Sequence, residues 1–206
     1  MKKKNFKEIL DYTTLNPVIT NWYKPESLKN FEGDEWATKC ILNDHISAGH
    51  NHGYFTLLHN LVSNLKDDAI IVELGSREAI SDVCIIDVLK PEQIFYSIDI
   101  IYDYRYVNKD LITDNVHIII GDCLSTDVIN QISNGIDLIF FDTIHTYTQV
   151  QAEFDLYKDK MNDGCIILID DIKLNDKGRF FDEVDLEKYD ISELCHNVSG
   201  FGALIY

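Results

Sequence analysis

The fold is decided by the stretch AIIVELGSREAIS at residues 69–81, in which a short apolar run ends at a glycine. Residues 69–74 have the length and the continuous apolar character of a strand that is buried on both faces. Gly75 permits the sharp turn that follows such a strand. Apolar residues then recur at helical spacing as far as Leu89, and Pro91 ends the helix. This stretch therefore predicts a strand–turn–helix unit.

Similar units follow along the rest of the chain. Four more apolar runs end in an acidic residue or a glycine turn, and they cover residues 94–98, 116–120, 136–141 and 165–169. A helical stripe runs from Tyr147 to Met161. Buried strands that alternate with helices predict a doubly wound, mostly parallel α/β sheet with helices on both faces. The runs Ile191–Asn197 and Phe201–Tyr206 predict a C-terminal hairpin, which adds an antiparallel strand.

Residues 1–65 lack strand-like runs and are interpreted as an N-terminal helical segment of the same domain, whereas residues 66–206 form the α/β part. Helices are predicted over Asp34–Ile46 and Tyr54–Leu65 from the spacing of their apolar residues. Four of the seven histidines fall in this segment, but their spacing gives no closed set of metal ligands. We expect the segment to act as a lid or as a contact between copies of the chain in a homo-oligomer.

The charge balance limits the partners of this chain. Its 18 Lys and Arg stand against 35 Asp and Glu, for a formal net charge of −17. Phosphate-rich and anionic lipid surfaces attract positive charge, so nucleic acid and membranes are disfavoured as partners. No run approaches the roughly 18 apolar residues that span a bilayer, and no apolar segment follows the basic start, so a cytoplasmic protein is expected. The five cysteines include no C-x-x-C pair and are expected to be reduced, buried thiols.

Acidic residues accompany the first three predicted strands, and sheets of this kind bind ligands at the carboxyl ends of their strands. Glu73 precedes the first turn, Asp99 ends the second strand and Asp122 follows the third. An acid at the position of Asp99 can accept hydrogen bonds from both ribose hydroxyls. The pattern favours a nucleoside site over solvated strand ends. NAD is disfavoured because Arg77 and Ala79 stand where a dinucleotide-binding loop has glycines.

A second acidic group follows the fourth and fifth strands. Asp142 ends the fourth strand, Asp170 and Asp171 end the fifth, and His145 lies three residues after Asp142. Neighbouring parallel strands would bring these carboxylates together, where they repel one another unless a cation lies between them. Oxygen ligands suit Mg²⁺, Ca²⁺ or Mn²⁺. The alternatives are a helix N-cap for Asp142, a solvated strand end for the other two aspartates, and a surface loop for His145. Together, the four residues favour a divalent metal site.

With these residues, the chain resembles the class I S-adenosylmethionine (SAM)-dependent methyltransferases over about residues 50–206. The segments FFDTIHTY at 140–147 and GCIILIDD at 164–171 resemble in particular the metal-dependent O-methyltransferases that act on sugar hydroxyls of macrolide antibiotics, the macrocin and mycinamicin type. The resemblance implies a Rossmann-like methyltransferase fold with seven strands. One departure is Ala79, where many relatives carry glycine.

The resemblance also implies a role for each site residue. The implied cofactor-binding residues are Glu73, Gly75, Ser76, Ser81, Asp99, Asp122 and Asp142. Asp142, Asp170 and Asp171 are the implied ligands of Mg²⁺ or another divalent cation. Asp142 and His145 are the implied catalytic residues, with His145 as the general base.

The predicted function is therefore transfer of a methyl group from SAM to a hydroxyl of a small molecule, with a sugar or a glycosylated natural product as the expected acceptor. Two alternatives stay open at this point. One is an NAD-type oxidoreductase or epimerase on a Rossmann-like sheet, which would need the glycines that the first loop lacks. The other is a non-catalytic nucleoside-binding protein with a degenerate loop.

Overall fold

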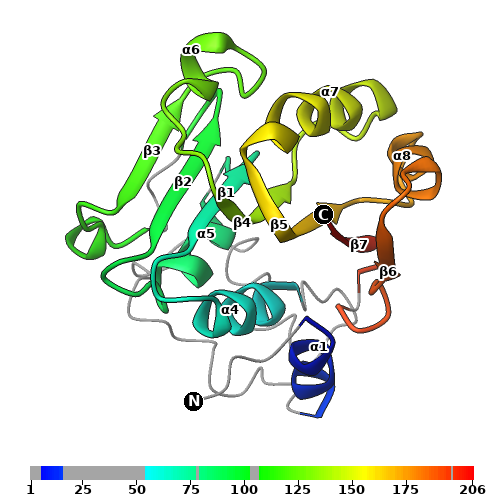
Figure 1. The fold of residues 1–206 in the computed structure, drawn as a ribbon, viewed down its shortest axis with the longest axis horizontal. Helices are drawn as coiled ribbons and strands as arrows, with labels where there is room; N and C mark the ends of the chain where they lie inside the picture. The colour runs from blue at the N-terminus through cyan, green and yellow to red at the C-terminus, as the bar shows by residue number, and fades with distance from the viewer. Residues whose placement is uncertain (1–5, 16–53, 78, 103–106, 196) are drawn as a thin grey trace, which may run out of the picture.

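The computed structural model describes residues 6–15, 54–77, 79–102, 107–195 and 197–206. Within these ranges, strands form a sheet in the order β3-β2-β1-β4-β5-β7-β6 (Figure 1). The strands are β1 Ile70–Leu74, β2 Ile94–Asp99, β3 Val116–Ile120, β4 Ile136–Phe141, β5 Met161–Asp170, β6 Glu187–Asp190 and β7 Phe201–Ile205. The order confirms the predicted seven-stranded, doubly wound sheet, because the chain starts at β1 and adds strands on both sides.

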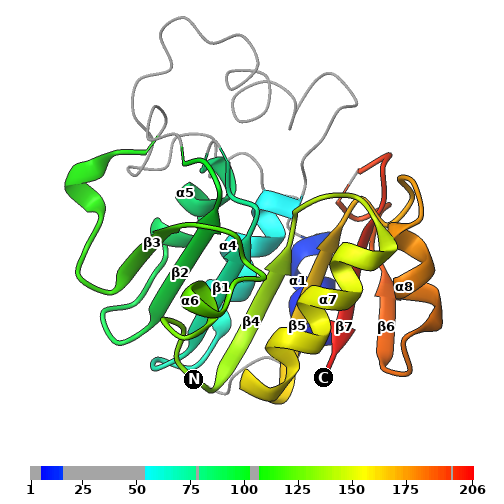
Figure 2. The ribbon, with the colours of Figure 1, turned by 90° about the horizontal axis from the view of Figure 1, so that it is seen from above.

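The first five strands run parallel, as their continuous apolar sequences predicted. The two C-terminal strands are different, since β7 is antiparallel to both β5 and β6. This confirms the predicted C-terminal hairpin and its antiparallel strand. Figure 2 shows the strands side by side, with the ends of β4 and β5 at the same edge of the sheet.

The prediction of a strand over Ile191–Asn197 is wrong, because the hairpin's first strand is β6, just before it. The Ser192 hydroxyl donates to the Asp190 carboxylate and accepts from the Phe201 amide at 2.9 Å. The Cys195 amide donates to the Ile191 carbonyl at 2.9 Å, which closes a helical turn. These local bonds offer the backbone an alternative to strand pairing, and an apolar pattern does not reveal them.

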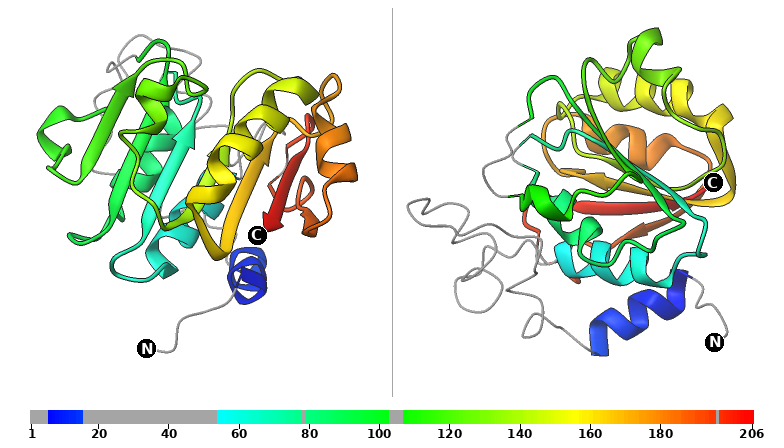
Figure 3. Two further views of the ribbon diagram at one scale, coloured as in Figure 1. Left: turned by 45° about the horizontal axis from the view of Figure 1, so that its top comes forward. Right: turned by 90° about the vertical axis from the view of Figure 1, so that its left-hand side faces the viewer.

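Helices cover both faces of the sheet. They are α1 Phe6–Leu15, α4 Tyr54–Asn64, α5 Ile80–Ile86, α6 Thr126–Ile129, α7 Tyr147–Tyr157 and α8 Lys177–Glu183, with short 3-10 turns η2 Lys109–Leu111 and η3 Lys158–Lys160. One hydrophobic core joins α1, α4 and α5 to one face, and a second joins α6, α7 and α8 to the other (Figure 3). The predicted stripe from Tyr147 ends at Tyr157, and Met161 instead begins β5.

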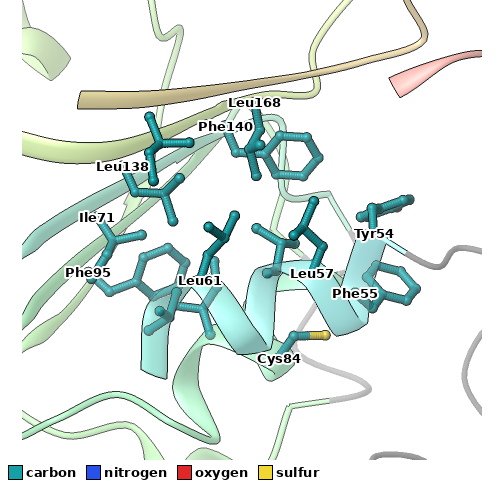
Figure 4. Packing of buried hydrophobic residues seen from close by; sticks show 14 of the residues in the cluster. Tyr54, Phe55, Leu57, Leu61, Ile71, Cys84, Phe95, Leu138, Phe140 and Leu168 are labelled. Atoms are coloured by element: carbon teal, nitrogen blue, oxygen red, sulfur yellow. The ribbon is translucent and has the colours of Figure 1, made fainter. Parts of the chain in front are cut away.

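The core under α4 shows how the N-terminal part attaches to the sheet (Figure 4). Leu57 and Leu61 of α4 are fully buried and point toward Leu138 and Phe140 of β4. Burying each leucine contributes about 1.5–3 kcal/mol relative to exposing it. Tyr54 stacks on Phe201 of β7, with 5.0 Å between ring centroids. Residues 54–64 are therefore part of the packed core of the sheet.

Some predicted features lie outside the described residues. These are the helix over Asp34–Ile46, Cys40, and three of the four N-terminal histidines, His45, His50 and His52. The other four cysteines, Cys84, Cys123, Cys165 and Cys195, are free and buried. Among the residues that the structure describes, no helix combines the length and the apolar character that a membrane crossing requires.

Candidate functional site

The turn after β1 brings the two predicted groups of acids together. Gly75 has a φ of 98°, which favours glycine, and a Cβ on this residue would overlap the carbonyl oxygen of Asp142. The Gly75 amide donates to Ile98 at 2.8 Å, and the Asp142 amide donates to Leu74 at 2.8 Å. The first loop is thus pressed against the end of β4, so a ligand on this loop would lie next to Asp142.

The predicted cofactor residue Glu73 lies beneath this loop rather than at the open edge. Its carboxyl is fully buried, and the Ser81 hydroxyl of α5 donates to Oε1. Its second oxygen, Oε2, is buried without a hydrogen-bond partner among the described residues, and Asp82, whose charge acts on Glu73, is also fully buried. Asp82 accepts hydrogen bonds from Ser97 at 2.6 Å and from Tyr102 at 2.5 Å, both on Oδ2. We call Glu73 and Asp82 the acid pair.

Two negative charges on the acid pair are disfavoured. Burial first, and then the charge of Asp82, raise the pKa of Glu73 well above its usual range. Burial also raises the pKa of Asp82, although hydrogen bonds from Glu73, Ser97 and Tyr102 favour its charged form. Burial and the repulsion between the two acids therefore favour the neutral form of Glu73. Sequence analysis missed Asp82, because an acid in the first turn of a helix is also typical of a solvated position.

The other predicted cofactor residues include Asp99, Ser76 and Asp122. Asp99 accepts from the Arg77 amide at 2.8 Å on Oδ2 and from the Ile101 amide at 3.0 Å on Oδ1, so it ties the first loop to the end of β2. Ser76 is buried, and its hydroxyl has no partner among the described residues. Asp122 is exposed and accepts from the Leu124 amide at 2.9 Å.

Two residues that replace expected glycines keep a glycine-like backbone. Arg77 has a φ of 40° and Ala79 a φ of 59°, both in the left-handed region. A residue with a side chain in this region costs about 1 kcal/mol or more. The loop therefore has a left-handed path despite lacking the glycines, and the hydrogen bond from Arg77 to Asp99 helps to hold it.

The second acidic group is a compact cluster, which we call the aspartate trio: Asp142, Asp170 and Asp171. One carboxylate oxygen from each lies within 4.8 Å of the others. β4 and β5 are neighbours, and Phe141, the last residue of β4, pairs with Ile169, the residue before the end of β5, so the pairing brings the strand ends together. The predicted convergence of these three residues is therefore present in the structure.

The aspartate trio is crowded with negative charge. Asp170 and Asp171 are each 8% exposed, and the Asn197 side chain donates to Asp170 at 2.6 Å. Burial and the charge of Asp171 raise the pKa of Asp170 to about 7. Burial and the charge of Asp170 raise the pKa of Asp142 well above its usual range. Such shifts are expected where carboxylates lie close together away from water.

His145 joins this cluster. Its Nδ1 lies 2.6 Å from Oδ2 of Asp171, and its side chain is partly exposed. The left-handed φ of 60° at Asp171 lets the chain turn directly after β5. A carboxylate on one ring nitrogen orients the imidazole and leaves the opposite nitrogen, Nε2, to exchange a proton elsewhere.

Two buried ionisable residues next to the trio were not predicted from the sequence. Lys177 of α8 is fully buried, and its Nζ donates to the Phe141 carbonyl at 3.1 Å. Glu153 of α7 is fully buried and accepts from the Thr143 hydroxyl and from Gln149 at 2.9 Å. Glu153 could have been found, because it lies on the predicted apolar stripe between Val150 and Tyr157. No spacing indicated Lys177, since it follows a polar loop.

Comparison with known proteins gives this arrangement a family context. Residues 72–172 match a family model described as a methyltransferase domain. A search of curated proteins found no match. The fold is similar to that of the O-methyltransferase TomG from Streptomyces achromogenes, which is involved in tomaymycin synthesis and was solved in complex with SAM. The TM-score is 0.58 and the identity 16%, and the alignment covers 100% of this chain and 98% of that chain.

Two further solved structures share the fold. A methyltransferase from Geobacter sulfurreducens has a TM-score of 0.54 and 12% identity, with 74% of this chain and 77% of that chain covered. Fibrillarin from Aeropyrum pernix, solved with natively bound S-adenosyl-L-methionine, has a TM-score of 0.50 and 17% identity, with 73% and 74% covered. The family match confirms the prediction of a methyltransferase enzyme, and these structures confirm the Rossmann-like methyltransferase fold. Neither comparison favours the oxidoreductase or the non-catalytic alternative.

Proposed function

We propose that this protein is a SAM-dependent O-methyltransferase that uses a divalent cation and methylates a hydroxyl group of a small molecule. The observation that carries the proposal is the aspartate trio, in which one oxygen from each carboxylate lies within 4.8 Å of the others. The trio lies beside the first loop, which follows β1 and which we call the donor loop because it would hold the methyl donor. The contact between Gly75 and Asp142 makes the trio and the donor loop adjacent parts of one site. The methyltransferase family match supports the donor, and the trio supports the cation.

The trio suits a hard divalent cation such as Mg²⁺. All three ligands are carboxylate oxygens, which Mg²⁺ and Mn²⁺ prefer to sulfur or nitrogen. Burial and mutual repulsion raise the pKa values of Asp142 and Asp170. A bound dication would lower both pKa values, so binding and ionisation favour each other. Asp142, Asp170 and Asp171 would hold the ion.

Residues on the other half of the edge would hold the methyl donor. The buried Ser76 hydroxyl without a partner offers a hydrogen bond within the first loop. Asp99 lies at the end of β2, where its carboxylate can accept from ribose hydroxyls in addition to the amides it already binds. Asp122 is exposed and can accept from an adenine amino group. Glu73 acts from beneath, through Ser81, by fixing the start of α5.

The chemistry is an in-line displacement. A bound divalent cation would lower the pKa of a hydroxyl group that it holds. The hydroxyl proton passes to Nε2 of His145, the oxygen bonds to the methyl carbon, and the carbon–sulfur bond of the sulfonium donor breaks. Asp171 stabilises the imidazolium that forms, because its Oδ2 lies 2.6 Å from Nδ1. Holding oxygen and methyl carbon about 3–3.5 Å apart is the main contribution of such a site.

A sugar or glycoside with two vicinal hydroxyls is the acceptor that we propose. Two neighbouring oxygens can replace two waters on a cation that keeps open positions. The resemblance of residues 140–147 and 164–171 to the sugar O-methyltransferases supports this class. The net charge of −17 supports a small molecule over nucleic acid.

The proposal is tested with the purified chain. S-adenosylhomocysteine binding is measured by calorimetry, and methyl transfer from labelled SAM is measured over a panel of glycosides with and without vicinal hydroxyls. We expect micromolar-range binding, transfer to at least one vicinal diol, loss of transfer in EDTA and recovery with Mg²⁺. Transfer that continues in EDTA would remove the cation from the mechanism, and absence of S-adenosylhomocysteine binding would remove the donor.

A further inference from the structure

Asp142 is held on both sides by buried charged residues that come from other elements. The Phe141 carbonyl, just before it, accepts from Lys177 Nζ at 3.1 Å. The Thr143 hydroxyl, just after it, donates to Glu153. Lys177 lies on α8 and Glu153 on α7, and these two helices pack against each other on the same face of the sheet. Asp142 itself is left to face Asp170 and Asp171.

The start of α8 also fixes the far end of the loop that carries His145. The Tyr147 amide donates to Asp176 at 2.9 Å, and the Arg179 guanidinium lies 4.4 Å from the centre of the Tyr147 ring. A Cβ on Gly178 would overlap the carbonyl oxygen of Ile172, so the same helix start is pressed against the segment that follows Asp171. One short helix therefore contacts the two loops that supply the aspartate trio.

The burial of Lys177 is energetically costly for a residue with a purely structural role. Its side chain is fully buried, and it is the only buried lysine or arginine among the described residues. Burying an ammonium group costs several kcal/mol unless nearby negative charge offsets it, and an apolar residue of similar size often serves stability equally well. Its Nζ donates to the Phe141 carbonyl, which places the ammonium group beside the acidic end of β4.

We propose that Lys177 and Glu153 are positioning residues, which hold the main chain on either side of Asp142 so that the aspartate trio is arranged before a divalent cation binds. The inference rests on the proposed function, because it assigns these residues to the cation site. Their distinct role is geometric: Lys177 fixes a carbonyl, and Glu153 fixes a hydroxyl. Neither is expected to bind the cation or to touch the acceptor.

The two effects of Lys177 on cation affinity have opposite signs, which makes the inference testable. A buried positive charge repels a second cation, so removing it would tighten binding if charge were its only role. Removing a support of a metal ligand weakens binding, typically by 10- to 100-fold. The direction of the change in Lys177→Met therefore separates the two roles.

The experiment measures Mn²⁺ affinity of the full chain by electron paramagnetic resonance, without any turnover. We expect Mn²⁺ affinity to fall about 10-fold or more in Lys177→Met. In Thr143→Val it should fall about 3-fold, because this variant removes the hydroxyl that donates a hydrogen bond to Glu153. Glu153→Gln should stay near wild type, because its amide oxygen can still accept from Thr143. Lys188→Met is the matched control, since Lys188 donates to the Phe181 carbonyl at 3.0 Å, at the other end of α8.

S-adenosylhomocysteine affinity should stay within about 2-fold in every variant, as expected for a local change. Unchanged or tighter Mn²⁺ binding by Lys177→Met would overturn the inference. If thermal melting shows that Lys177→Met does not fold, Thr143→Val decides, and wild-type affinity in that variant overturns it. If the wild-type chain binds no Mn²⁺, the cation-dependent function fails and takes this inference with it. If the wild-type chain binds Mn²⁺ and Lys177→Met and Thr143→Val bind it equally well, this inference is refuted while the proposed function stands.

Discussion

The acid pair under the donor loop and the aspartate trio beside it are two clusters of carboxyls with different partners. In the acid pair, Ser81 donates to Glu73, and Ser97 and Tyr102 donate to Asp82. In the aspartate trio, one oxygen from each of three carboxylates lies within 4.8 Å of the others at the edge of the sheet. A proton can neutralise the trio in part, because the pKa of Asp170 is raised to about 7.

The difference teaches how a fold separates a structural cluster of acids from one that binds a ligand. A carboxyl pair with hydroxyl donors is complete once it holds a proton, and it supports the turn above it. Three carboxylates with a neighbouring buried lysine stay incomplete, so they gain most from a divalent ion. Removing an acid should therefore cost function in the trio and should change the pH dependence of stability in the pair.

The largest expected effect concerns His145, whose imidazole lies against Asp171 of the trio. We expect His145→Ala to lower kcat about 100- to 10,000-fold, because a positioned general base contributes that much. S-adenosylhomocysteine affinity should not change, since His145 contacts Asp171 rather than the donor loop. The measurement is steady-state transfer beside calorimetry. His117→Ala is the control, because this exposed histidine stacks on Tyr96 of β2. Wild-type turnover in His145→Ala would assign the base elsewhere.

The second prediction is that Asp170→Asn makes the metal-free protein more stable while abolishing cation binding. Folding raises the pKa of Asp170 to about 7, above its unfolded value near 3.9. The folded state then binds more protons than the unfolded state between these values, so stability falls as pH rises from about 4 to 7 and stays low above. The cost at pH 8 is up to about 4 kcal/mol, and asparagine removes it while still accepting from Asn197.

Urea unfolding in EDTA at pH 5 and pH 8 measures this effect. The variant should exceed wild type at pH 8 and approach it at pH 5. Added Mg²⁺ should raise the stability of wild type and leave the variant unchanged. A variant that is less stable than wild type at pH 8 in EDTA would show that repulsion in the trio is already relieved within the chain.

A smaller effect is expected in the acid pair from Asp82→Asn. Asparagine removes the charge of Asp82, which raises the pKa of Glu73, and its amide can donate to Oε2, so this pKa should fall. Wild type loses stability as pH rises from the unfolded pKa of Glu73 toward its raised folded value, and the variant should lose less. The difference between the two unfolding curves at each pH isolates the pair, because the trio contributes equally to both. Parallel curves would mean that Asp82 does not raise the pKa of Glu73.

Much of this contrast was predictable from sequence, and the reasons differ between the two clusters. Each member of the trio directly follows an apolar strand, and parallel strands align their carboxyl ends, so Asp142, Asp170 and Asp171 could be placed together without coordinates. Glu73 was instead assigned through the family resemblance of the first loop, and its buried partner Asp82 was not recognised. A helical acid in the first turn looks the same in sequence whether it meets water or another carboxyl.

The supports of the site were harder to predict because they depend on tertiary contacts. Lys177 lies far from β4 along the chain, and only the packing of α8 brings its Nζ to the Phe141 carbonyl. The misplaced hairpin strand has a local cause instead. The hydroxyl of Ser192 binds Asp190 and Phe201, which converts an apolar run into a turn.

The smallest expected effect tests whether the donor half relies on hydrogen bonds or on glycine. Ala79 has a left-handed φ of 59° and a fully buried methyl group. Glycine would relieve about 1–2 kcal/mol of backbone strain, but it would lose about 0.8 kcal/mol of burial and 0.4–1 kcal/mol through the freer unfolded chain.

Ala79→Gly should therefore change the free energy of unfolding by less than about 0.5 kcal/mol and should leave S-adenosylhomocysteine affinity within about 2-fold, because Asp99 still holds the loop through Arg77. Ala79→Val is the contrasting variant and should lose more than about 1 kcal/mol, since a β-branched side chain tolerates this φ poorly. Denaturant unfolding and calorimetry measure both. If Ala79→Gly instead bound S-adenosylhomocysteine tenfold more tightly, the alanine would be limiting the donor site, and the first loop would be the less complete half of the edge.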